Sequence, residues 1–139
     1  MKDEGGMGTE GKEVELMETA ERVFQEFTAG LATGDWGAFL DRLSDDFYFW
    51  FPVGQYQGLN TGRVRAAEFF QYVSETFKPG LKVTVDRVTA SDTTVVFEVR
   101  SEGLMRGEPY KNRVALSFDF RGEKVCAYRE YLGSDGKSN

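Results

Sequence analysis

One stretch constrains the fold more than any other: residues 110–132, where apolar and polar side chains alternate at period two on either side of a Gly-Glu pair. Such alternation is typical of half-buried strands, so the stretch is predicted to be a β-hairpin. The apolar face of its first strand begins with two polar residues, Tyr110 and Asn112, and the returning strand brings Glu130 close to them. Because polar groups on a buried face must be hydrogen-bonded or line a cavity, this end of the hairpin predicts a pocket.

The register of the hairpin decides which face Glu130 occupies. A strict two-residue loop would place Glu130 opposite Ala115, on the outer face of the sheet. A three-residue loop with a bulge would place it opposite Val114, on the face of Asn112. The alternation by itself leaves both registers open.

Apolar residues at three- and four-residue steps predict two amphipathic helices, over residues 13–31 and 64–77. Asp35 is expected to cap a short helix that runs to Leu43. The apolar stripes and the hairpin are expected to share one core. Its predicted members are Met17, Phe24, Phe27, Phe70, Val73, Leu116 and Phe118.

Three more strands are predicted, over residues 47–53, 81–90 and 94–105, with a loop at 55–62. The order of helix, short helix, strand, helix and then four antiparallel strands predicts an α+β fold. In this fold a curved antiparallel sheet wraps the long first helix, and one open end of the resulting cone holds the pocket.

Composition excludes several kinds of function. A net charge of −6 argues against nucleic acid or an anionic membrane as partner. The chain has no histidine and one cysteine, Cys126, which excludes zinc sites and His-dependent nucleophiles and leaves only a carboxylate metal site, for which there is no support. Neither a metal nor a cofactor is expected. With no visible signal peptide, the single cysteine is consistent with the cytoplasm.

The chain is predicted to form one domain between two tails. Residues 1–12 are glycine-rich and charged and are expected to form a flexible tail, and residues 134–139 a polar one. The domain itself spans residues 13–133.

The sequence resembles the NTF2-like superfamily, in its SnoaL-like branch, which includes ketosteroid isomerase, limonene-epoxide hydrolase and polyketide cyclases. The motifs that carry the resemblance are Gly-Asp-Trp at 34–36, Phe-Pro-Val-Gly at 51–54, Gly-x-Pro-Tyr-x-Asn at 107–112 and Arg-Glu-Tyr at 129–131. It implies a cone-shaped barrel with an apolar pocket, and frequent homodimers. It also favours the bulged register, which is the one we adopt.

Several catalytic positions of the family carry other residues here. The base of ketosteroid isomerase corresponds to Phe51, and its second acid to Leu116. The arginine and first aspartate of the epoxide hydrolase fall near Val99 and Ser101, and its last aspartate corresponds to Glu130. These departures remove the family's known acid–base groups except Glu130.

Glu130 is therefore the predicted catalytic acid or base, in an apolar pocket for a small organic molecule. The residues predicted to line this pocket are Tyr110, Asn112, Val114, Tyr128, Leu132, Trp50 and Phe51. The activity would be of isomerase, cyclase or hydrolase type. The alternative is a binding module without catalysis, or a dimeric interaction domain.

Two further features concern the outer face of the sheet. Arg100 lies between Glu98 and Glu102, and the three are expected to form a charged ladder there, the alternative being an ion pair in the pocket. Apolar residues on the last strand, namely Val125, Ala127 and Tyr131, together with the resemblance predict a homodimer through this face.

Overall fold

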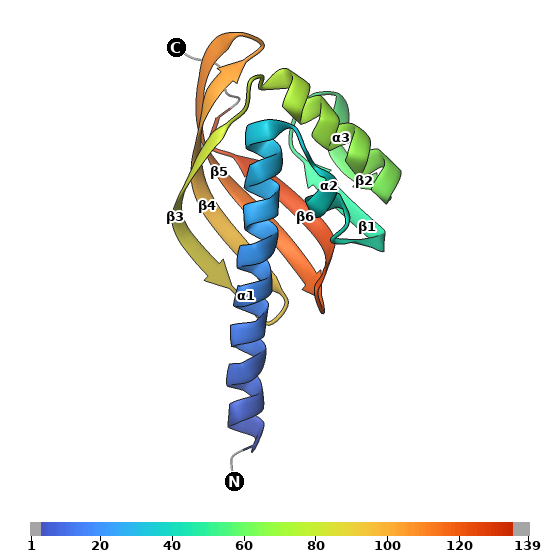
Figure 1. The fold of residues 1–139 in the computed structure, drawn as a ribbon, viewed down its shortest axis with the longest axis vertical. Helices are drawn as coiled ribbons and strands as arrows, with labels where there is room; N and C mark the ends of the chain where they lie inside the picture. The colour runs from blue at the N-terminus through green and yellow to red at the C-terminus, as the bar shows by residue number, and fades with distance from the viewer. Residues whose placement is uncertain (1–3, 135–139) are drawn as a thin grey trace.

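The computed structural model describes the backbone of residues 4–134 and the side chains of residues 11–134. Within this part of the chain, three helices and six strands form one curved layer of sheet with helices on its concave side (Figure 1). The helices are α1 (Glu4–Thr33), α2 (Gly37–Leu40) and α3 (Arg63–Thr76), with a 3-10 turn η1 (Gly54–Tyr56). The strands are β1 (Leu43–Phe51), β2 (Gly58–Thr61), β3 (Lys82–Ala90), β4 (Thr94–Met105), β5 (Glu108–Arg121) and β6 (Lys124–Leu132).

The six strands form one open sheet in the order β2-β1-β6-β5-β4-β3. All neighbours are antiparallel except β1 and β6, which run parallel. The predicted α+β cone is confirmed, but the sheet is mixed and not antiparallel throughout. The predicted loop at 55–62 is wrong in part, because residues 58–61 form β2. Four residues are too few to show a period-two pattern.

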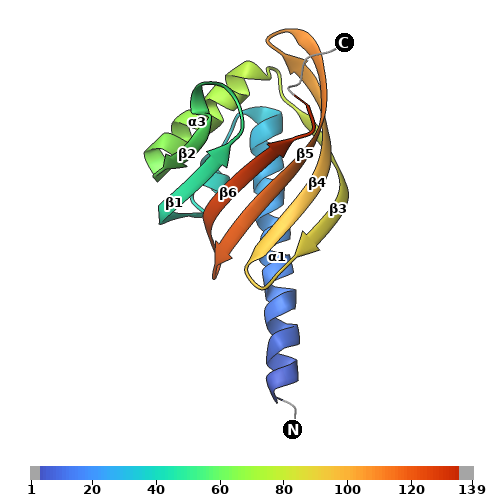
Figure 2. The same ribbon diagram turned by 180° about the vertical axis from the view of Figure 1, so that it is seen from behind.

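The helices cover one face of the sheet and leave the other open, as the view from behind shows (Figure 2). Side chains from α1, α3 and the strands share one core, as predicted: Phe24, Phe27, Phe70, Leu116 and Phe118 are buried, with Met17 and Val73 packed against them. Phe27 is central, because its ring lies within 6 Å of the rings of Phe39 at 5.3 Å and Phe118 at 5.4 Å. This aromatic core fixes α1 against the concave face.

Helix α1 is longer than the predicted helix over 13–31, since it begins at Glu4. The expected flexible tail over residues 1–12 therefore overlaps the helix, and its first three residues lie outside the described part. The helix ends at Thr33, before Gly34, whose φ of 85° favours glycine. Asp35 accepts a hydrogen bond from the Gly37 N–H at 3.1 Å, but the N-cap of α2 is Trp36, so the predicted cap is wrong by one residue. Helix α2 stops at Leu40 and not at Leu43.

The β5–β6 hairpin has a register that neither predicted alternative describes. Its loop has two residues, because Arg121 pairs with Lys124, and a bulge follows in β6 at Cys126. Glu130 therefore pairs with Leu116 and not with Val114. The extra residue of the bulge shifts by one the alternation of side chains between the two faces of the sheet. Glu130 therefore points to the concave face. The predicted partner was wrong and the resulting face was right.

The bulge also separates the residues predicted for the outer face of β6. Val125, which precedes the bulge, pairs with Phe120 and is fully buried on the concave side. Only Ala127 and Tyr131, which follow it, keep the outer face, and of these Tyr131 is exposed. The predicted outer position of Val125 is therefore wrong.

Candidate functional site

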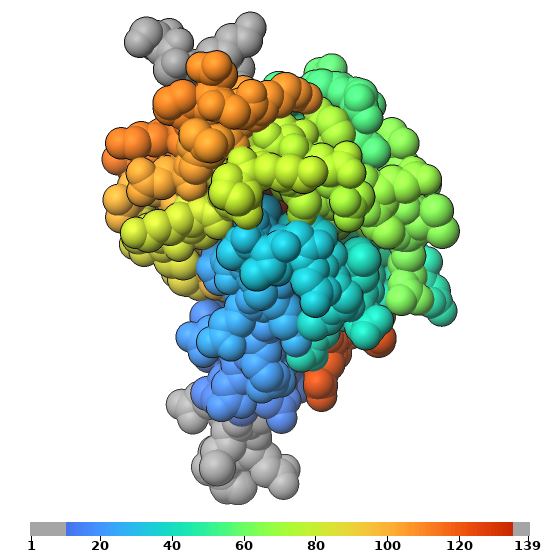
Figure 3. Space-filling model, turned by 45° about the horizontal axis from the view of Figure 1, so that its top comes forward, coloured from blue at the N-terminus to red at the C-terminus, as the bar shows by residue number. Residues whose placement is uncertain are grey.

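A cavity of about 430 Å³ lies between α3, the end of α1 and the concave face of the sheet. Its walls are largely aromatic and aliphatic, with a few polar groups. The polar side chains among the lining residues are Tyr72, Thr76, Ser101, Arg106, Tyr110 and Glu130. Figure 3 shows the chain between α3 and β3 (yellow-green) lying over the C-terminal end of α1, next to this region. The volume and the apolar walls are typical of small-molecule sites.

Glu130 is the only acidic side chain that lines the cavity among the described residues. Its carboxylate accepts a short hydrogen bond from the hydroxyl of Tyr128. Burial raises the pKa of Glu130 from its usual 4.5 to about 7, and the Tyr128 hydrogen bond opposes this rise because it stabilises the ionised form. No cation within residues 11–134 forms an ion pair with Glu130. The carboxyl group can therefore exchange a proton near neutral pH.

Tyr128 holds Glu130 in place because it is itself immobile. It is fully buried, and its ring lies 5.6 Å from that of Phe27 and 5.2 Å from that of Phe118. Burial raises the pKa of Tyr128 well above its usual value, and the neighbouring charge of Glu130 adds to this rise. The phenol thus stays protonated and acts as a donor to the carboxylate.

Tyr110 lies at the same end of the cavity, on β5. Its hydroxyl accepts a hydrogen bond from the Asn112 amide at 3.0 Å, and its ring lies 4.8 Å from that of Phe77. Burial raises the pKa of Tyr110, although the Asn112 hydrogen bond works against it, and the charge of Glu130 adds to the rise. A side-chain hydrogen bond with Ser101 also lowers the pKa of Tyr110, so its hydroxyl has polar partners in both Asn112 and Ser101.

The structure brings most of the predicted site residues together. Glu130, Tyr110, Val114, Leu132 and Phe51 all line the cavity, and Tyr128 lies directly behind Glu130. Asn112 does not line the cavity but supports Tyr110 from behind. Its Nδ2 also donates to the carbonyl of Ser134 at 3.2 Å, which fastens the chain after β6 to this end of the sheet.

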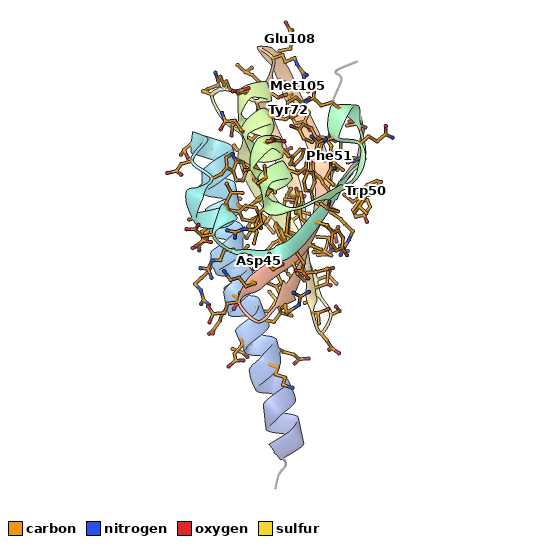
Figure 4. All side chains as sticks on the ribbon, turned by 90° about the vertical axis from the view of Figure 1, so that its right-hand side faces the viewer. Asp45, Trp50, Phe51, Tyr72, Met105 and Glu108 are labelled. Carbon is orange, nitrogen blue, oxygen red and sulfur yellow. The ribbon has the colours of Figure 1, made fainter. Side chains whose placement is uncertain are left out.

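Trp50 was predicted to line the pocket, and this is wrong. Alternation along β1 puts Phe49 and Phe51 on the concave face and Trp50 on the outer face, where its ring stacks on Tyr131 at 5.5 Å. Figure 4 shows Trp50 pointing away from the body of the domain. The aromatic run of β1 hid this alternation, because both of its faces carry aromatic residues.

Arg100 lies on the outer face, as the charged-ladder interpretation expected, and its guanidinium pairs with Asp86 at 2.9 Å. The alternative, a pocket ion pair of Arg100, therefore does not form. Phe51, Leu116, Val99 and Ser101, which the resemblance aligned with catalytic positions, line the cavity.

Four polar lining residues were not predicted as pocket residues: Tyr72, Thr76, Ser101 and Arg106. Tyr72 precedes Val73 of the apolar stripe of α3, and Arg106 lies in the turn between β4 and β5. Figure 4 labels Tyr72 and Met105, the residue before Arg106. No pattern in the sequence indicated that this turn meets α3, because the contact depends on how the sheet curves. Among the described residues, no three acidic, cysteine or histidine side chains gather as a metal site.

The family comparison agrees with this geometry. The profile of the SnoaL-like domain matches residues 24–128, which is most of the chain. The chain therefore belongs to the SnoaL-like domain family and has the NTF2-like fold, as its motifs predicted. No curated protein matches it. Within the described residues, no helix combines the length and apolarity needed to cross a membrane.

Solved structures show the same fold. An NTF2-like protein from Anabaena variabilis ATCC 29413 is 60% identical, with a TM-score of 0.86 over 90% of this chain and 94% of that one. A SnoaL-like polyketide cyclase candidate from Jannaschia sp. CCS1 is 22% identical, with a TM-score of 0.72 over 86% of each chain. An isomerase candidate from Bacillus subtilis is 19% identical, with a TM-score of 0.70 over 85% of this chain and 88% of that one. The latter two share the fold alone.

Proposed function

We propose that the protein binds a small, largely apolar organic molecule in the cavity and transfers a proton to or from it through Glu130. The observation that carries this proposal is the carboxyl group of Glu130 in an apolar cavity, with its pKa raised by burial to about 7. Both protonation states are then populated at neutral pH, which is the condition for efficient general acid–base catalysis. Tyr128 orients the carboxylate toward the cavity.

The reaction that these groups support is proton abstraction from a carbon next to a carbonyl. The ionised carboxylate removes the proton, and the electron pair of the broken C–H bond moves toward the carbonyl oxygen. Tyr110 would donate a hydrogen bond to the negative charge that develops on this oxygen. Return of the proton to a conjugated carbon completes an isomerisation, whereas return to the same carbon only exchanges its hydrogen. The isomerase and polyketide cyclase candidates with this fold are compatible with such chemistry.

Deuterium exchange can test this proposal without the natural substrate. With 2-tetralone, a bicyclic ketone, the wild-type protein is expected to accelerate incorporation of deuterium at the carbon next to the carbonyl in D₂O, and mass spectrometry measures the rate. Glu130→Gln should lower this rate by about 10²- to 10⁴-fold. The wild-type rate should rise with pH and level off above about 7, because the carboxylate is the base.

Glu98→Gln provides the control, because Glu98 is exposed on the outer face and pairs across the sheet with Ala115. It should exchange deuterium at the wild-type rate. Equal rates for the wild-type protein and Glu130→Gln would refute a catalytic Glu130. Binding of the ketone with no exchange would instead support the second candidate function, a non-catalytic binding module. The apolar residues Phe51 and Leu116, at the family's catalytic positions, favour this candidate.

We also propose that the protein forms a homodimer through the outer face of β2, β1 and β6. Four apolar side chains share this face: Tyr48 and Tyr131 are exposed to 39% and 47%, Leu59 to 65%, and Trp50 stacks on Tyr131. Leu59 and Trp50 are paired across β1 and β2, so the patch is continuous. A second copy of the chain would cover it on both molecules at once.

Light scattering at micromolar protein should give the mass of a dimer for the wild-type protein, and that of a monomer for Tyr131→Glu. Val64→Glu is the matched control, because Val64 is 76% exposed on α3, away from this face. It should remain dimeric. A monomeric wild-type protein, or dimers that survive Tyr131→Glu, would exclude this interface.

A further inference from the structure

Arg106 is the only charged side chain besides Glu130 that lines the cavity among the described residues. It lies at the mouth, in the turn between β4 and β5. Its backbone N–H donates to the carbonyl of Thr76 at 2.7 Å, and its Nη2 donates to the hydroxyl of Tyr72 at 3.1 Å. These two bonds join the tip of the hairpin to α3. Arg106 is therefore held against α3 by two hydrogen bonds, one from its backbone and one from its side chain.

Within residues 11–134 the guanidinium of Arg106 has no carboxylate partner. Most of the other arginines pair with a carboxylate, as Arg42 does with Glu26 at 2.9 Å and Arg129 with Asp119. No acidic group within residues 11–134 forms an ion pair with Arg106. A guanidinium has five N–H donors, and one of them is used here, on Tyr72. The Tyr72 oxygen accepts this bond, and among residues 11–134 its own proton has no acceptor.

The backbone at Arg106 adds an independent reason to look for a role. The turn has two residues, since Met105 pairs with Glu108, and both have positive φ, 49° at Arg106 and 86° at Gly107. Asparagine, aspartate or glycine is preferred at the first position of such a turn. An arginine is uncommon there, because a residue with a Cβ is strained at positive φ. Residues with such strained backbone conformations are concentrated at ligand sites.

We infer that the ligand carries a carboxylate, which Arg106 and Tyr72 bind at the mouth while the apolar body fills the cavity toward Glu130. A guanidinium matches the two oxygens of a carboxylate with parallel hydrogen bonds. The inference rests on the proposed function, because it uses the same cavity, and it narrows the substrate class to small apolar acids that carry a second polar group at the far end.

A pair of probes of equal shape tests this inference: 2-naphthaleneacetate, which is an anion, and 2-naphthaleneacetamide, which is neutral. Calorimetry at pH 6 and low ionic strength is suitable, because Glu130 with a pKa of about 7 is then mostly protonated and does not repel the anion. The wild-type protein is expected to bind the anion about tenfold more tightly than the amide. In Arg106→Gln this preference should disappear while the affinity for the amide is unchanged.

Two variants complete the design. Arg106→Lys keeps the positive charge and should retain part of the preference for the anion. This variant separates the effect of the charge from the effect of the turn geometry. Arg113→Gln removes an exposed arginine that does not line this cavity and should keep the full preference. The preference should also weaken as salt is added, because the mouth is open to solvent.

The outcomes distinguish the two proposals. Equal binding of both probes to the wild-type protein, or a preference that survives Arg106→Gln, overturns the anionic ligand and leaves the apolar site standing. Weaker binding of both probes in Arg106→Gln, with the preference kept, also overturns it, since Arg106 would then act only on the shape of the mouth. Failure of the wild-type protein to bind either probe overturns both the apolar site and the anionic ligand.

Discussion

The free energy of unfolding of the Glu130→Gln variant, measured relative to the wild-type protein, is expected to rise by about 3 kcal/mol between pH 4.5 and pH 8. The reason is that the pKa of Glu130 is raised from 4.5 to about 7 in the folded state. The folded protein therefore holds this proton more tightly than the unfolded chain. As pH rises through the window between 4.5 and 7, the wild-type protein loses stability, and above 7 the difference stays constant. A glutamine, which does not titrate, escapes this loss.

Urea unfolding across this pH range measures the effect, as the difference between the two stability profiles. Comparing profiles removes any constant effect of the amide group itself. Tyr128→Phe should shift the upper end of the window to higher pH, since it removes the hydrogen bond that favours the ionised carboxylate. Glu98→Gln, at an exposed position, should run parallel to the wild-type profile. A parallel profile for Glu130→Gln would mean that its carboxyl group titrates like a free one.

Gly30→Ala should destabilise the fold by about 2 kcal/mol, although alanine normally stabilises the middle of a helix by about 1 kcal/mol over glycine. A Cβ at Gly30 would lie 2.4 Å from Cε3 of Trp36. The indole cannot move aside easily, because its Nε1 donates to Ser74 Oγ at 2.7 Å and its ring lies 4.6 Å from that of Phe70. The clash must therefore be relieved by a shift of α1 or by breaking these contacts.

Gly11→Ala in the same helix is the matched control, because no heavy atom lies within 4 Å of its Cβ position. It should be neutral or stabilising by up to about 1 kcal/mol. Thermal unfolding of both variants checks the pair, with Gly30→Ala lowering the midpoint by several degrees. If both substitutions change stability in the same direction, the contact with Trp36 does not control the packing of α1.

Local periodicity accounts for the parts of the fold that were predicted correctly. Two patterns depend only on neighbours a few residues away, so they can be seen directly in the sequence. They are the helical stripes that include Phe24 and Phe70, and the strand alternation at Leu116 and Phe118. The parallel pairing of β1 with β6 joins segments far apart in the chain, and no local pattern reports such a partner. The four residues of β2 were missed because their strand conformation depends on pairing with β1.

The candidate site could likewise be predicted only where it depends on local alternation along a strand. Alternation from Tyr110 onward pointed to Glu130, and the cavity that these residues share follows from the face they occupy. Trp50 was misplaced because aromatic residues occupy both faces of β1. Arg106 and Tyr72 meet only through the curvature of the sheet, a property of the whole strand set that single strands do not encode. The bulge at Cys126 changed the partner of Glu130 without a glycine or other marker at that position.

The parallel pairing of β1 with β6 has a consequence for how the chain acquires its structure. Phe49 of β1 lies beside Tyr128, which is synthesised much later because it belongs to the last of the six strands in the sequence. Until β6 is available, β1 and the β2 strand attached to it have no neighbour that joins them to β5 and the rest of the sheet. Pairing over such sequence separation slows folding and prolongs the period in which the chain is prone to aggregate.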